Sequence, residues 1–319
     1  MRIARWERSG SVEEGFVTGD AVVAFPDALG VRDVLSGGLP LARSLHDRIG
    51  ALPSTPLAAV RLLAPLEPAS IRDFVAFEEH VEGVSASVDG KSEVVPEWYD
   101  APTFYFTNPH TVLGPGAVLA PPVTERLDFE LEIAAVVGGE GGANLDAAAA
   151  RDVIFGYTVM NDWSARDLQS REMRVRLGPA KGKDFGTALG PWIVTADELE
   201  RHLDADGFLA VRAEVRVNGE LVGEDLVSNM GWPFPELVAY ASSNSRVVAG
   251  DVLGSGTVGN GGCLAELWGR RGRQDPRPLR EGDEVRMLVE GIGELVGTVG
   301  AAVEVQAPPR ARPRPRNRR

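Results

Sequence analysis

Acidic side chains stand inside otherwise apolar, strand-like stretches at two places in the chain. Glu130 and Glu132 lie in the stretch 127–133, and Asp162 ends the stretch 156–162. Because side chains alternate along a strand, Glu130 and Glu132 share one face, where two carboxylates repel each other and are costly to bury without a cation. With Asp162 they could form an oxygen-rich site for a hard cation such as Mg2+. For the pair alone, the wet face of a half-exposed strand is the commoner arrangement.

Potential hydrogen-bond donors follow Asp162. In a helix, Arg166 and Gln169 would lie three residues apart on one face and could present donors beside Asp162. The alternative is an ordinary helix start capped by Asp162 or Ser164. Lys183 stands in a glycine-flanked turn, where glycine lets the backbone approach a ligand closely, although such a lysine is usually a surface residue.

His80 and Glu266 are candidates for an acid–base pair. Glu266 lies in an apolar context after the glycine-rich loop 254–262, which lacks the features of nucleotide-binding loops. A lone acid there would form a structural salt bridge unless a base sits opposite. His80 is the best candidate for that base, because Asp73, Phe77 and His80 have the spacing of one helix face. The alternatives are helix capping for Asp73 and a surface position for His80.

Hydrophobic patterns predict a glycine-rich, mixed β body with few helices, hence an α+β fold. The expected strands are 16–18, 21–25, 104–106, 129–137, 153–160, 191–194, 211–217, 285–289 and 295–305. Asn218-Gly219 predicts a type I′ hairpin turn after the strand 211–217. The expected helices are 41–50, 71–81 and 234–242, with a capping box at Ser70–Asp73 opening the second and a polar loop over 82–97.

Three regions are expected along the chain. Residues 1–65 form a small N-terminal domain, residues 66–306 form the main domain, and residues 307–319 form a disordered Pro/Arg tail. The last ten residues carry six arginines and cannot bury a core.

Composition narrows the classes of protein. Among 319 residues, 44% are apolar and 25% are charged, and the net charge of −13 argues against a nucleic-acid partner. The single cysteine, Cys263, excludes an internal disulfide and fits a cytoplasmic location. Neither a signal peptide nor a membrane-spanning stretch is expected.

Taken together, these segments resemble the fumarylacetoacetate hydrolase family from about residue 70 to 305. The resemblance rests on the following motifs in this order: Arg72-Asp-Phe74 with His80, 129–132, 161–169, 182–187, 254–257 and 264–268. It implies a homodimer in which each chain has a small N-terminal domain and a β-roll catalytic domain.

The resemblance also implies roles for individual residues. The residues implied to bind Mg2+ (or Ca2+ or Mn2+) are Asp73, Glu130, Glu132 and Asp162. The residues implied in catalysis are His80 with Glu266, which activate water, and Arg166, Gln169 and Lys183, which face developing negative charge. Tyr105 and Thr257 match positions that contact substrate.

The implied activity is metal-dependent hydrolysis of a C–C bond in a β-diketone or acylpyruvate, a small 2-oxo or 1,3-diketo acid. Decarboxylation, isomerisation or dehydration of a 2-oxo acid through an enolate is the alternative on the same scaffold. A metal-stabilised β protein without catalysis is a third hypothesis. Val75 and Met173 stand where the fumarylacetoacetate hydrolases have substrate-contacting tyrosines, and Asp89 stands where they have an arginine, so we expect a substrate other than fumarylacetoacetate.

Overall fold

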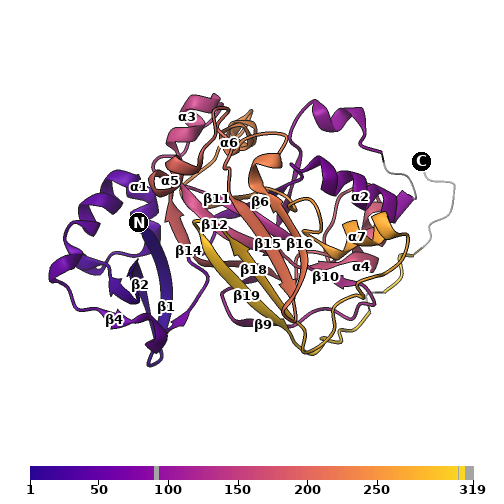
Figure 1. Cartoon of the computed structure of the whole chain (residues 1–319), viewed down its shortest axis with the longest axis horizontal. Coiled ribbons are helices and arrows are strands. Elements are labelled where there is room, and N and C mark those ends of the chain that lie inside the picture. The colour runs from indigo at the N-terminus through magenta and orange to yellow at the C-terminus, as the bar shows by residue number, and fades with distance from the viewer. Residues whose placement is uncertain (90–92, 308, 313–319) are drawn as a thin grey trace.

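The computed structural model describes residues 1–89, 93–307 and 309–312, and its strands form three sheets (Figure 1). The largest sheet has the order β4-β3-β2-β1-β14-β12-β11-β17-β6-β7, with β5 beside β1 and β8 beside β14. A second sheet has the order β16-β15-β18-β19-β9, and β10 pairs with β13. The sheets contain parallel and antiparallel pairs, which together with the helices confirms the α+β class.

The strands of the largest sheet are β1 (Arg2–Arg8), β2 (Ser11–Thr18), β3 (Ala21–Ala24), β4 (Thr55–Pro56), β5 (Arg61–Leu62), β6 (Ser70–Phe74), β7 (Phe104–Thr107), β8 (Val112–Leu113), β11 (Leu131–Val137), β12 (Ile154–Asp162), β14 (Thr187–Thr195) and β17 (Asp251–Gly254). Those of the smaller sheets are β9 (Ala117–Leu119), β10 (Leu127–Asp128), β13 (Ser164–Ala165), β15 (Arg212–Val217), β16 (Glu220–Leu226), β18 (Glu284–Val289) and β19 (Gly293–Val299). The α-helices are α1 (Val31–His46), α2 (Glu78–Asp89), α3 (Ala147–Asp152), α4 (Arg166–Met173), α5 (Ala196–Leu199), α6 (Phe234–Ser242) and α7 (Leu264–Arg271).

Strands β11 and β12 form the centre of the large sheet and are buried along their whole length. Burial of both faces requires apolar residues at successive positions, which is why these strands stand out in the sequence. The strands expected over 129–137 and 153–160 are therefore confirmed.

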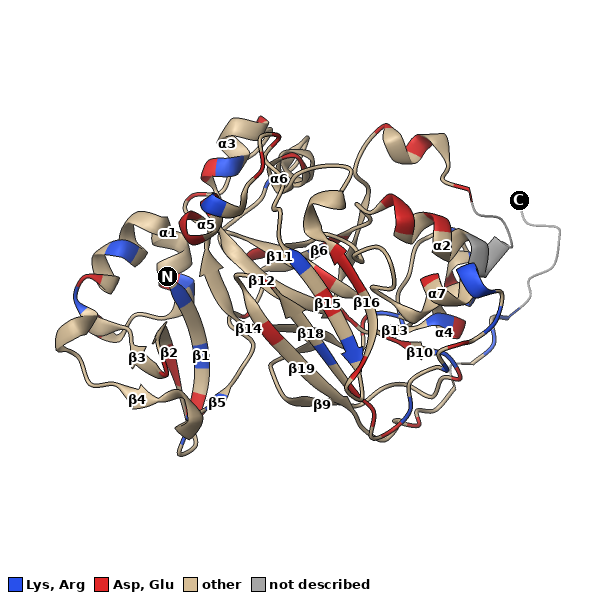
Figure 2. Ribbon diagram, viewed as in Figure 1, with Lys and Arg blue, Asp and Glu red and all other residues tan. Residues whose placement is uncertain are grey.

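The five-stranded sheet buries only one face. Ala213 and Val215 of β15 and Met287 of β18 are buried, whereas less buried charged residues alternate with them along the strands, as the coloured ribbon shows (Figure 2). The predicted hairpin is confirmed, because β15 and β16 pair and Asn218 and Gly219 both have positive φ, at 52° and 85°.

Other boundaries differ from the expected ones. Helix α6 is confirmed over Phe234–Ser242, but the leading helix spans Val31–His46 rather than 41–50. Strand β19 begins at Gly293 and ends at Val299, before the expected end at residue 305.

The helix expected over 71–81 is wrong. Ser70–Phe74 is strand β6, which pairs parallel with β17 and antiparallel with β7. The Ser70 hydroxyl donates to Asp251 at 2.8 Å, so the residue expected to cap a helix makes a contact across two strands. The helix begins at Glu78 and runs to Asp89, through part of the expected loop, so Asp73 and His80 do not share a helix face.

The N-terminal region joins the large sheet directly. Arg2 and Ile3 of β1 pair with Val194 and Ile193 of β14, and one apolar core contains Ile3 together with Ile193 and Met160. The division at residues 65 and 66 stays a prediction, as does the disordered tail, most of which lies outside the described residues. Among the helices of the described segments, none combines the length and the apolar character needed to span a membrane.

Candidate active site

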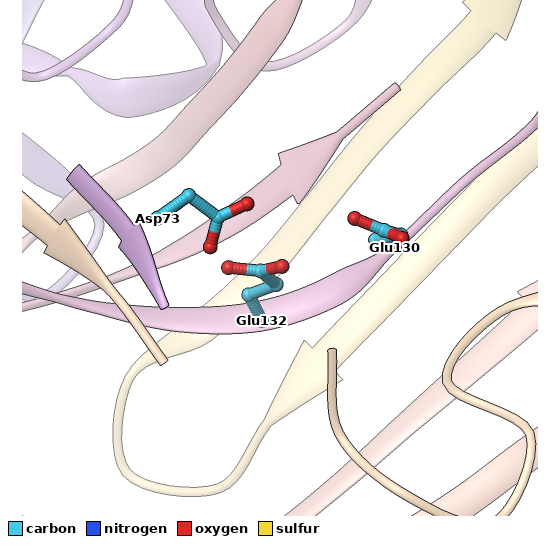
Figure 3. A group of neighbouring side chains, drawn as sticks. All are labelled: Asp73, Glu130 and Glu132. Atoms are coloured by element: carbon cyan, nitrogen blue, oxygen red, sulfur yellow. The ribbon is translucent and has the colours of Figure 1, made fainter. Parts of the chain in front are cut away.

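Three acids from two strand segments converge beside the large sheet (Figure 3). Asp73 lies on β6, Glu130 directly precedes β11, and Glu132 lies on β11. A carboxylate oxygen of each lies within 4.8 Å of the other two, and the residues are only 2%, 4% and 0% exposed. The alternative that Glu130 and Glu132 lie on the solvent-exposed face of a half-exposed strand is therefore wrong.

Gly254 of β17 keeps space open beside these carboxylates. It is the register partner of Asp73, and a Cβ atom at this glycine would lie 2.7 Å from Glu132 Oε2 and 2.9 Å from Asp73 Oδ1. Asp73 Oδ1 and Glu132 Oε1 are buried and have no hydrogen-bond partner among the residues that the structure describes. These buried oxygens lack hydrogen-bond donors and surround a space that the side chain of any residue other than glycine at position 254 would fill. Such an arrangement fits a hard cation such as Mg2+, Ca2+ or Mn2+.

The electrostatics of the acids agree with that fit. Burial, and then the neighbouring charge of Asp162, raise the pKa of Asp73 well above its ordinary value. Burial, Asp73 and Glu130 likewise raise the pKa of Glu132. A divalent cation would remove this destabilisation of the ionised carboxylates.

Two buried cations border the acids. Lys183 is 2% exposed, so the surface position is wrong, and its Nζ contacts Glu130 and lies 2.5 Å from Asp162 Oδ2. Arg166 Nη1 lies 2.8 Å from Glu130 Oε1. Although burial alone would raise it, the pKa of Glu130 is lowered by Lys183 and Arg166.

Asp162 lies next to the three-acid group and is not one of its members. The Tyr105 hydroxyl donates to Asp162 Oδ2, while Asp162 Oδ1 is buried without a hydrogen-bond partner. Tyr105 is on β7, opposite Asp73 in the register with β6. Burial, and then Asp162, raise the pKa of Tyr105 well above its ordinary value, so the phenol remains a donor.

Helix α4 delivers Arg166 and Gln169 as the sequence predicts. Arg166 Nη1 donates to Gln169 Oε1 at 3.1 Å, and Arg166 Nη2 is buried without a hydrogen-bond partner. Ser164 lies in β13, and α4 has no side-chain cap, so capping by Ser164 is wrong.

Helices α2 and α7 bring His80 and Glu266 together. His80 Nδ1 lies 4.0 Å from Glu266 Oε2, beyond hydrogen-bond length, and both residues are buried. Burial lowers the pKa of His80 to about 4, so its imidazole is neutral at pH 7 and can accept a proton. Burial raises the pKa of Glu266 to about 7, against the lowering effect of Arg270, whose guanidinium lies 2.9 Å away.

Thr257 is 2% exposed and follows Gly256, whose amide donates to Glu132 Oε2 at 3.2 Å. Within the described residues its hydroxyl makes no hydrogen bond to the other candidate residues. The structure therefore brings Thr257 near the acid group without showing a contact from its side chain.

Sequence reasoning missed Asp128. This fully buried carboxylate lies 2.8 Å from Arg166 Nε and accepts hydrogen bonds from the amides of Leu264 and Ala265, at 2.8 and 3.0 Å. It thus links the arginine on α4 to the start of α7, which carries Glu266. The available signal was an acid in an apolar stretch two residues before Glu130.

The candidate site therefore combines a group of acids suited to a cation, a neutral imidazole and cationic donors. Such a set can polarise a carbonyl group, move a proton and stabilise negative charge that develops on oxygen.

Known proteins share both the sequence pattern and the fold. A family model described as "Fumarylacetoacetate (FAA) hydrolase C-terminal" matches residues 69–300. Oxaloacetate tautomerase YisK of Bacillus subtilis (strain 168) is 29% identical over 296 residues, which cover 91% of this chain and 87% of the relative.

Two solved structures show the likeness in three dimensions. Fumarylacetoacetate hydrolase of the psychrophile Exiguobacterium antarcticum has a TM-score of 0.72 at 25% identity, covering 94% of this chain and 99% of that one. Maleylpyruvate hydrolase from Sphingobium sp. SYK-6, in complex with manganese(II) ion and pyruvate, has a TM-score of 0.71 at 21% identity, covering 95% and 100%.

The matched residues 69–300 make up most of the chain and include every candidate residue of the site. The chain therefore belongs to the fumarylacetoacetate hydrolase family of enzymes.

Proposed function

We propose that this protein is a metal-dependent hydrolase that cleaves a C–C bond of a β-diketone or acylpyruvate. The observation that carries the proposal is the neutral, buried His80, with Glu266 beside it, in a site that also holds buried acids and cations. A base that takes a proton from water must be unprotonated at the working pH, and His80 meets this requirement.

The residues proposed to hold the metal ion are Asp73, Glu130, Glu132 and Asp162. When bound, Mg2+ (or Ca2+ or Mn2+) would supply Lewis acidity that polarises the substrate carbonyl groups. The manganese and pyruvate bound to the maleylpyruvate hydrolase of the same fold support this choice of cofactor and of a 2-oxo acid substrate.

The side chains of the protein would carry the remaining chemistry. His80 takes a proton from water, typically worth ~10²–10⁴-fold in rate, and the oxygen of that water bonds to one carbonyl carbon. The C–C bond then breaks, and its electron pair remains on the leaving carbon as an enolate, which receives the proton. Lys183, Arg166 and Gln169 are the proposed donors to this charge, each worth about 2.7–4 kcal/mol in comparable sites.

The direct test is to incubate the purified full chain with acylpyruvates and Mg2+ or Mn2+. Loss of enol absorbance together with release of free pyruvate and the matching carboxylic acid is the expected result, and His80→Ala should abolish both. The hydrolase proposal fails if no acylpyruvate is cleaved, or if His80→Ala cleaves as fast as the wild type.

A second candidate is isomerisation, dehydration or decarboxylation of a 2-oxo acid, which needs no attack by water. The observation that favours it is the similarity to oxaloacetate tautomerase over 91% of this chain. In the assay above, enol absorbance would change without release of pyruvate and the matching carboxylic acid, and Glu266→Gln would remain as active as the wild type.

We also expect a homodimer, as the family resemblance implies. Light scattering on the full chain should give twice the chain mass of 34.1 kDa, and a mass of one chain would refute the expectation.

A further inference from the structure

His80 lies near a second side chain that the acid–base pair leaves without a role. Its Nδ1 is 3.7 Å from the sulfur of Cys263 and 4.0 Å from Glu266 Oε2. Sulfur is large enough to form a weak hydrogen bond at 3.7 Å, whereas 4.0 Å is too long for one to a carboxylate oxygen. The thiol and the ring are therefore within reach of a hydrogen bond in this structure, and the tautomer of the ring decides which of them donates.

Cys263 is held rigidly. It is fully buried and is the N-cap residue of α7, where its sulfur accepts a hydrogen bond from the amide of Glu266 at 3.4 Å. Burial raises the pKa of this thiol well above its ordinary value, so it stays protonated and is unsuited to act as a nucleophile. A packing and hydrogen-bonding role remains.

The carboxylate of Glu266 is occupied elsewhere. Its Oε1 accepts from the amide of Gly261 at 3.1 Å and pairs with Arg270 at 2.9 Å, while Oε2 is buried without a hydrogen-bond partner. In this structure Glu266 can therefore influence His80 through its charge, at a separation too long for a hydrogen bond to the ring.

Gly83 allows helix α2 to approach α7 closely. This buried glycine lies three residues after His80, and a Cβ atom there would come within 2.4 Å of Glu266 Cγ and 3.1 Å of its Cα. Any larger residue would push the helices apart and move His80 away from Cys263.

We propose that Cys263 is a positioning residue for His80: its sulfur accepts the Nδ1 proton of the ring and leaves Nε2 free as the base. The neutral imidazole carries one proton, and the hydrogen bond at one ring nitrogen decides which nitrogen keeps it. The close contact at Gly83 sets the separation that this hydrogen bond requires. The inference rests on the proposed role of His80 as a base and adds the group that selects its tautomer.

The test reads the tautomer directly and needs no substrate. Long-range proton–nitrogen spectra of the full chain, labelled with nitrogen-15 in its four histidines, are recorded for the wild type, Cys263→Ser and Cys263→Ala. The His80 signals are assigned by their loss in His80→Asn. We expect a ring protonated at Nδ1 in the wild type and in Cys263→Ser, whose hydroxyl also accepts, and a mixture of tautomers in Cys263→Ala and Gly83→Ala.

Asp146→Ala is the matched control, because Asp146 caps α3 through the amide of Ala149 far from His80 in the sequence. It should lower the Tm, as the loss of a helix cap does, and leave the His80 signals unchanged. An Nδ1-protonated ring in Cys263→Ala, or an Nε2-protonated ring in the wild type, would overturn the proposal.

Kinetics separate this proposal from the proposed function. With an acylpyruvate that is cleaved, Cys263→Ala should lower kcat about tenfold with little change in KM, less than the ~10²–10⁴-fold typical of general-base catalysis, and Cys263→Ser should recover most of it. An unchanged kcat in Cys263→Ala would count against positioning. A tautomer change in a protein that cleaves no acylpyruvate would refute the hydrolase and keep the positioning role.

Discussion

At the scale of single residues, the site is governed by how buried charges compensate one another. Lys183 and Arg166 neutralise part of the charge on Glu130 and Asp162, whereas within the described residues neither Asp73 nor Glu132 forms an ion pair with a basic side chain. Burying uncompensated charge costs several kcal/mol per ion. A divalent cation bound at these carboxylates would compensate their negative charge.

Replacing Lys183 by methionine tests how much its positive charge contributes to stability. The change leaves Glu130 and Asp162 without their shared cation, and we expect the free energy of unfolding to fall by about 3–5 kcal/mol in chelator-treated protein. Urea denaturation measures it. Lys181→Met is the matched control, because the exposed ion pair of Lys181 with Asp184 is worth less than about 1 kcal/mol. Equal losses in the two variants would contradict this account.

The pKa of Glu266 predicts a pH dependence of activity. Because its pKa is raised to about 7, Glu266 becomes fully ionised only above neutral pH, while His80, with a pKa of about 4, is already a free base. Ionised Glu266 makes His80 a stronger base, so kcat/KM should rise as pH increases through about 7. Glu266→Gln should lose this rise. A variant that keeps it would show that another group titrates there.

At the scale of secondary-structure elements, Asp128 connects three of them. It lies on β10, binds Arg166 of α4 and accepts from the first amides of α7. The positions of Arg166 and of α7, which carries Glu266, are therefore linked through a single carboxylate.

Asp128→Asn should loosen the start of α7. An amide presents one oxygen instead of two, so at least one buried donor loses its partner, and we expect a loss of about 2–3 kcal/mol. Hydrogen exchange at the amides of Leu264 and Ala265 should quicken, whereas Asp146→Ala should leave it unchanged. Unaltered exchange at both amides in Asp128→Asn would refute the link.

The sequence predicted the elements whose signal is local. Strands β11 and β12 have apolar residues on both faces. The hairpin of β15 and β16 is joined by Asn218-Gly219, a dipeptide that strongly favours a type I′ turn. Strand β6 was missed because Ser70–Asp73 also satisfies a local helix-start pattern. Its partner β17 lies about 180 residues further along the chain, as the 181-residue separation of Ser70 and Asp251 shows, and no local pattern reveals that pairing.

The candidate site was predictable to a similar degree. Glu130, Glu132 and Asp162 could be found because charge in an apolar context is costly and demands a partner. Arg166 followed from its helical spacing after Asp162, whereas the roles of Asp73 and Lys183 came from the family resemblance. The roles of Asp128 and Cys263 could not be predicted, because they depend on contacts between residues far apart in the sequence. Asp128 accepts from Leu264, 136 residues away, and Cys263 contacts His80, 183 residues away.

At the scale of the whole molecule, the N-terminal region and the main body share one sheet and one apolar core. Deleting residues 1–65 would leave β14 without its neighbour β1 and expose apolar side chains such as Ile193. We expect the fragment 66–319 to aggregate or to melt well below the full chain, as measured by size-exclusion chromatography and circular dichroism. Deleting residues 307–319 is the control and should leave Tm unchanged. A fragment 66–319 as stable as the full chain would show that the two parts fold independently.

The gathering of acids around a divalent ion is most directly tested by calorimetric titration of the chelator-treated full chain with Mg2+ and Mn2+. The account predicts one ion bound per chain, with affinity at least about tenfold lower in Glu132→Gln and unchanged in Glu220→Gln, an exposed acid on β16. Absence of binding to the wild type with Mg2+, Mn2+ and Ca2+, or equal affinity in Glu132→Gln, would contradict it.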